Sequence, residues 1–132
     1  MTDPATGATG EQLSAEQLSA EQLSDEDAKL VTLARGARGR VGAAEGAAVR
    51  DETGRTYSGA TVALPSLEVS ALRLAVAQAA ASGARGLEAA VVVRRSPEPD
   101  PADLDAVRDL GGAGVTVHVV ASDGSVLATV TS

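Results

Sequence analysis

Residue types that often carry catalysis are scarce in this chain of 132 residues, which has one histidine and no cysteine. His118 lies in the valine-rich segment 115–119, where a strand histidine bonded to a neighbour or to water is the ordinary role. Ser70 and His118 could form a nucleophile–base pair, but no nucleophile elbow or oxyanion motif accompanies them. His118 also has no partner ligands for a metal ion. Neither residue predicts an active site by itself.

Four aspartates, Asp100, Asp103, Asp105 and Asp109, could suggest a cation site. Their spacing does not fit an EF-hand loop, which needs ligands at alternate positions and a glycine at the sixth. We expect Asp100 and Asp103 to complement the positive N-terminus of a helix, and the other two to face water.

Glycines and arginines are interspersed over residues 35–46, as Arg35, Gly36, Arg38, Gly39, Arg40, Gly42 and Gly46. A phosphate-binding loop would end in Gly-Lys-Ser/Thr, and that ending is absent. These arginines could hold an anion weakly, but a solvated helix end and loop is the simpler interpretation.

Composition and charge exclude several classes of function. Tyr57 is the only aromatic residue, so the core must consist of Ala, Val and Leu, and we expect modest stability. The net charge of −7 comes from residues 1–27, because residues 28–132 hold equal numbers of acidic and basic residues. A neutral domain without aromatic stacking platforms argues against nucleic-acid binding. No apolar run reaches the length of a membrane span.

The first part of the chain differs from the rest. Residues 1–24 are predicted to form a disordered, acidic, low-complexity tail, and residues 25–132 a single domain. A repeat of Glu-Gln-Leu-Ser-Ala places Leu13, Leu18 and Leu23 about 140° apart around a helix, so they form no apolar stripe. A partner-binding arm that folds on contact is the alternative. No signal-peptide pattern is present, and we expect a cytoplasmic location.

Hydrophobic periodicity and turn residues predict helices interleaved with strands. The expected elements are helix 24–40, hairpin strands 47–50 and 55–62, helix 66–82, strand 87–93, helix 101–110, and strands 115–121 and 125–131. Strands interleaved with helices predict a three-layer α/β/α fold, here with a five-stranded mixed sheet.

This order of elements and the residues of the first hairpin resemble the cytidine deaminase family. The likeness covers roughly residues 30–132 and depends on residues 46–49 (Gly-Ala-Ala-Val), the turn 51–54 (Asp-Glu-Thr-Gly), Tyr57 and Gly59. The resemblance implies a cytidine deaminase-like three-layer sandwich. It also implies a homo-oligomer, either a dimer or a tetramer, because the small enzymes of this family assemble as homotetramers.

The resemblance further implies where a site would lie. In the family, an Asn-x-Glu pair holds the ribose, and a cysteine and a glutamate at the start of a helix bind zinc and move protons. The matching residues here are Thr61 and Ala63 for the ribose pair, and Ser70 and Leu72 for the cysteine and glutamate. The later Pro-Cys-x-x-Cys should fall within residues 97–104, which hold no cysteine. We refer to Thr61, Ala63, Ser70 and Leu72 as the vestigial positions.

Zinc deaminases need three His or Cys ligands and a proton-transferring group worth ~10²–10⁴ in rate. A serine hydroxyl and a leucine supply neither function, so we expect no zinc, no other cofactor, and no catalytic residue. The expected function is that of a catalytically inactive cytidine deaminase-like protein serving as an interaction or assembly module. The alternatives are a deaminase-family hydrolase with an atypical site and a non-catalytic nucleoside-binding sensor. The protein partner or nucleoside ligand is left open.

Overall fold

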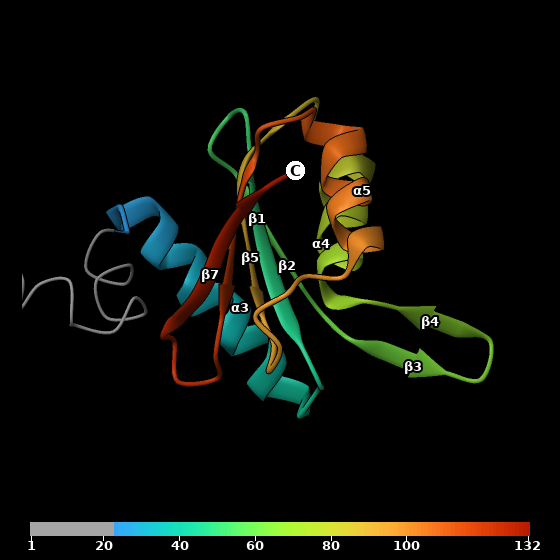
Figure 1. Cartoon of the computed structure of the whole chain (residues 1–132). Coiled ribbons are helices and arrows are strands. Elements are labelled where there is room, and N and C mark those ends of the chain that lie inside the picture. Colours follow the sequence, from blue (N-terminus) through green and yellow to red (C-terminus); the bar gives the residue numbers. More distant parts are fainter. Residues whose placement is uncertain (1–22) are drawn as a thin grey trace, which may run out of the picture.

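The computed structural model describes residues 23–132, which form a three-layer body and a separate two-stranded hairpin (Figure 1). The expected tail, residues 1–24, lies almost wholly outside the described residues. The elements in chain order are α3 (Asp25–Val41), β1 (Gly46–Asp51), β2 (Thr56–Ala60), β3 (Val62–Leu64), β4 (Leu67–Val69), α4 (Ala71–Ala81), β5 (Leu87–Val93), α5 (Pro101–Gly111), β6 (Thr116–Val120) and β7 (Val126–Thr131).

Five of the strands form one mixed sheet in the order β2-β1-β5-β6-β7. Strands β5 and β6 are parallel, and the other neighbouring pairs are antiparallel. Helix α3 covers one face of the sheet, and helices α4 and α5 cover the other (Figure 1). The predicted three-layer sandwich with a five-stranded mixed sheet is therefore confirmed.

Strand β5 is covered on both faces, as its unbroken apolar run predicted. Its side chains alternate between two cores, with Ala90 and Val92 on the side of α4 and α5, and Val91 and Val93 on the side of α3. The two cores consist of aliphatic residues, and Tyr57 packs against the first of them.

Two glycines of the first hairpin allow helices to lie very close to the sheet. A Cβ at Gly46 would collide with α3, since it would sit 2.7 Å from the Arg38 Cβ. A Cβ at Gly59 would lie 2.9 Å from the Ala71 carbonyl oxygen of α4. Small residues at these positions compensate for a core that has few large side chains.

The predicted start of the second helix is wrong. Pro65 and Ser66 form the turn of a short hairpin, β3 and β4, and the helix begins at Ala71 with Ser70 as its N-cap. Proline is favoured at the first central position of a turn because its φ is already near the required value. Ser70 is the better cap because its hydroxyl accepts from the Arg73 amide and has a second partner on α5.

The other helix starts follow the predicted caps. Ser24 accepts a hydrogen bond from the Asp27 amide at 3.0 Å, and Asp100 accepts one from the Ala102 amide at 3.0 Å. Pro101 occupies the first turn of α5. None of the helices that the structure describes is both long and apolar enough to cross a membrane.

Candidate functional site

The four vestigial positions do not surround one open cavity. Thr61 lies between β2 and β3, where its hydroxyl accepts a hydrogen bond from the Glu45 amide at 3.0 Å. Ala63 is exposed on the short hairpin. Leu72 is 0 % exposed and belongs to the core between the sheet and helices α4 and α5. The residue matched to the catalytic glutamate is thus part of the packed interior.

Ser70 has a partner that the sequence did not reveal. Its hydroxyl donates to the Asp103 carboxyl group with an Oγ–Oδ1 distance of 2.6 Å, and it also accepts from the Arg73 amide. Asp103 is buried, with 1 % of its surface exposed. This hydrogen bond joins the N-terminal ends of α4 and α5, two helices that lie side by side on the same face of the sheet.

Burial raises the pKa of Asp103 above its ordinary value, and the nearby Asp100 adds to the effect. The hydrogen bond from Ser70 acts in the opposite direction but does not cancel it. The prediction that Asp103 would complement the N-terminus of a helix is correct in position, but the residue is an interior hydrogen-bond acceptor. The signal for it was the spacing of Asp100 and Asp103, which equals that of the Cys-x-x-Cys expected in residues 97–104.

The residues at this place do not fit a zinc site. Ser70 is engaged in helix capping and with Asp103, and Asp100 Oδ1 accepts the hydrogen bond that caps α5. Residues 23–132 contain no group of three His, Cys, Asp or Glu side chains that could hold a metal ion. A zinc site needs at least three such nitrogen, sulfur or carboxylate oxygen donors from the protein.

His118 lies on the opposite face of the sheet from Ser70, so the nucleophile–base pair does not form. Its Nε2 lies 3.0 Å from Asp27 Oδ2, and its Nδ1 lies 2.9 Å from the Thr129 hydroxyl. Asp27 is also paired with Arg50, at 3.0 Å between Oδ1 and Nη2. His118 therefore ties α3 to the sheet, which is the ordinary structural role considered for it.

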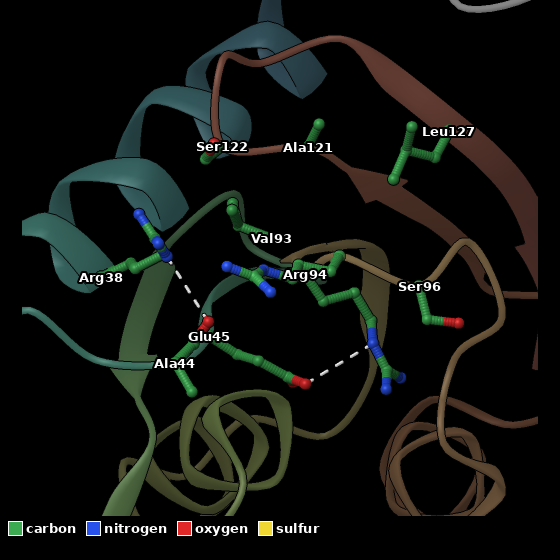
Figure 2. A pocket seen from close by; sticks show the side chains of 10 residues that line it. Arg38, Ala44, Glu45, Val93, Arg94, Ser96, Ala121, Ser122 and Leu127 are labelled. Atoms are coloured by element: carbon green, nitrogen blue, oxygen red, sulfur yellow. Dashed lines mark hydrogen bonds and ion pairs between the residues drawn. The ribbon is translucent and has the colours of Figure 1, made fainter.

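A cavity of about 760 Å³ lies at the carboxyl ends of β5 and β6, beside the end of α3 (Figure 2). Its charged lining residues are Arg38, Arg94, Arg95 and Glu45. Arg94 Nε lies 3.5 Å from Glu45 Oε2, and Arg38 Nε donates to the Ala44 carbonyl oxygen at 3.4 Å. None of the vestigial positions lines this cavity.

Burial raises the pKa of Glu45. The positive charge of Arg94 acts against this increase, and the negative charges of Asp103 and Asp100 add to it. In the sequence, the basic character of this cavity was visible only as two separate groups of arginines, at 35–40 and at 94–95. Arg94 and Arg95 follow β5 directly, and only the fold brings them to Arg38.

Comparison with known families gives the same answer as the fold. The family model described as cytidine deaminase-like matches residues 23–124, well over half of the chain. The chain belongs to the cytidine deaminase-like family. The resemblance stated from the first hairpin is therefore confirmed.

Solved structures of cytidine deaminases share the fold at low sequence identity. The crystal structure of cytidine deaminase from Burkholderia pseudomallei has a TM-score of 0.70 and 24% identity, over 83% of this chain and 93% of that one. The enzyme from Mycobacterium leprae has a TM-score of 0.63 and 21% identity, over 81% and 94%. The enzyme from Mycobacterium tuberculosis has a TM-score of 0.61 and 22% identity, over 72% and 85%. Comparison with curated protein sequences gives no significant match.

Proposed function

We propose that this member of the cytidine deaminase-like family is catalytically inactive and serves as an interaction or assembly module in the cytoplasm. The proposal rests on the structural roles of Ser70 and Leu72. Ser70 caps α4 and bonds to Asp103, while Leu72 is fully buried in the core. Both residues at the matched positions of the catalytic centre thus contribute to holding the fold together.

The experiment for inactivity is a turnover assay. The purified chain is incubated with cytidine in the presence of added zinc, and ammonia and uridine are measured beside the Mycobacterium tuberculosis cytidine deaminase as a positive control. We expect no product above the buffer background and no zinc retained after gel filtration. Formation of uridine, with one zinc ion held by each chain, would contradict the proposal.

An interaction role is supported by the short hairpin of β3 and β4. It projects from the body of the domain (Figure 1), and its two leucines at the turn, Leu64 and Leu67, are 55% and 52% exposed. An isolated two-stranded hairpin is marginally stable in water, and exposed apolar side chains favour contact with another surface.

Light scattering coupled to gel filtration tests the assembly part. We expect a dimer or tetramer that dissociates when Leu64 and Leu67 are both changed to serine. The matched control changes Leu33, which is 39% exposed on α3, to serine. A wild-type chain that stays monomeric at high concentration would refute self-assembly while leaving the turnover result unaffected.

A further inference from the structure

The cavity at the carboxyl ends of β5 and β6 concentrates positive charge in a domain that is otherwise balanced. Residues 28–132 have equal numbers of acidic and basic residues, yet three arginines and one glutamate line this cavity. Arg38 comes from the last turn of α3, whereas Arg94 and Arg95 follow β5. Because the cluster is not a by-product of a basic composition, it indicates a preference for an anion.

The Arg94 guanidinium lacks hydrogen-bond acceptors. Its side chain is only 18% exposed, and within the described part of the chain its buried Nε and Nη1 atoms have no hydrogen-bond partner. Glu45 is near enough for an ion pair at 3.5 Å but is not aligned for a hydrogen bond (Figure 2). Arg50, whose side chain is 13% exposed, also has one buried nitrogen without a partner, Nη1, but its Nη2 and Nε lie 3.0 and 2.9 Å from the carboxylates of Asp27 and Glu88. Buried donors normally find acceptors, so Arg94 is short of an anion.

The position and size of the cavity suit a small ligand. Ligands of open α/β sheets bind at the carboxyl ends of parallel strands, and β5 and β6 are the parallel pair of this sheet. The volume of about 760 Å³ falls within the usual range of roughly 300–1,000 Å³ for small-molecule sites. Guanidinium groups bind phosphate through two parallel hydrogen bonds, which favours phosphate over a simple halide.

The lining also limits what the rest of the ligand can be. Tyr57, the only aromatic residue of the chain, does not line the cavity, so a nucleobase would have no ring to stack on. Ser96, Ser122 and Glu45 offer hydrogen-bonding groups for hydroxyls. We infer that this cavity binds a small organic phosphate with a hydroxylated carbon skeleton, such as a sugar phosphate, held by Arg38, Arg94 and Arg95.

Calorimetric titration of the full chain with ribose 5-phosphate at low ionic strength tests the inference. We expect saturable binding that weakens as salt is added, because the contacts are ionic. Arg38→Gln and Arg95→Gln should each weaken binding about tenfold, since a hydrogen bond to a charged group is lost. Arg40→Gln, at the same helix end but outside the cavity, is the matched control and should leave binding unchanged.

Glu45→Gln should strengthen ligand binding, an effect that a folding defect would not produce. Removing this carboxylate should strengthen ribose 5-phosphate binding about fivefold, because a like charge near the phosphate is removed. Ribose should not bind, and cytidine 5′-monophosphate should bind no more tightly than ribose 5-phosphate. Absence of ribose 5-phosphate binding, equal binding of ribose, or tighter binding of cytidine or its monophosphate would overturn the inference. None of these results depends on whether the chain deaminates cytidine.

Discussion

At the level of one side chain, the position of Leu72 leaves no room for a charged group. It is fully buried among aliphatic neighbours of α4, α5 and the sheet. Leu72→Glu would place a carboxylate where no partner is available, at a cost of at least ~3 kcal/mol against a total stability of about 5–15 kcal/mol. We expect a lower melting temperature than that of the wild type, measured by circular dichroism, and no deaminase activity, measured by uridine formation.

Leu72→Met is the control for this prediction, because a volume-conserving change should cost less than about 1.5 kcal/mol. A Leu72→Glu variant as stable as the wild type would show that the position is less enclosed than its complete burial indicates.

The Ser70–Asp103 hydrogen bond gives a second prediction. The pKa of Asp103 is raised in the folded state, so the folded chain holds this proton more tightly than the unfolded chain. Its contribution to stability is therefore complete at low pH and is lost as the pH rises through the folded-state pKa. Asp103→Asn keeps an acceptor for Ser70 without the charge, and should be at least as stable as the wild type at neutral pH.

Thermal unfolding measured from pH 3 to pH 7 tests the direction of this pH dependence. The melting temperature of Asp103→Asn should exceed that of the wild type least at the lowest pH. Asp103→Ala lacks the acceptor as well and should lose about 1–3 kcal/mol. If Asp103→Asn were as damaging as Asp103→Ala at neutral pH, the charged form would be the stabilising one.

At the scale of elements, the turn between β1 and β2 depends on one carboxylate. Asp51 Oδ1 accepts from the Thr53 amide, the Thr53 hydroxyl and the Arg55 amide, and Oδ2 accepts from the Tyr57 hydroxyl at 2.9 Å. Burial alone would raise the pKa of Asp51, but the bonds from Thr53, Tyr57 and Arg55 lower it to about 2.

A lowered pKa means that Asp51 stabilises the fold above its ordinary pKa near 3.8, and that this contribution fades as the pH falls towards 2. Asp51→Asn should therefore lower the melting temperature at neutral pH, and the difference from the wild type should close in acid. Thr131→Ala, on the far edge strand β7, is a control that should show no such pH dependence. If the two melting temperatures differed by the same amount across this pH range, the ionised Asp51 carboxylate would not be the stabilising group.

The elements also show what the sequence could and could not provide. Strand β5 and helix α5 were predictable because an unbroken apolar run and an Asp-Pro cap are local signals. The short hairpin before α4 was missed because Ser66 and Ser70 are both acceptable helix caps by local criteria. The choice between them depends on Asp103, which lies 33 residues from Ser70 in the sequence. Likewise, Arg38 and Arg94 meet only because α3 ends beside the carboxyl end of β5.

At the scale of the whole molecule, the two cores share the same strands. Successive residues of β1 and β5 enter opposite cores, as Ala47 and Ala48 do in β1. Leu30 in one core and Leu72 in the other are both fully buried. Leu30→Ala and Leu72→Ala should each cost about 2–5 kcal/mol, and each should shift a single unfolding transition.

Denaturant titration followed by far-ultraviolet circular dichroism, together with amide exchange in α3 and α4, measures this coupling. Both helices should lose protection together in each variant. If α3 lost protection from amide exchange in Leu30→Ala while α4 kept it, the two faces of the sheet would fold independently.

The single aromatic ring of Tyr57 provides an intrinsic spectroscopic probe of the protein. All intrinsic emission and near-ultraviolet dichroism of the chain must originate from this single chromophore. Its hydroxyl donates to the Asp51 carboxylate, so a change in this signal would report opening of the turn between β1 and β2. Because the ring does not touch the arginine-lined cavity, a ligand there would be optically silent unless the sheet itself moved.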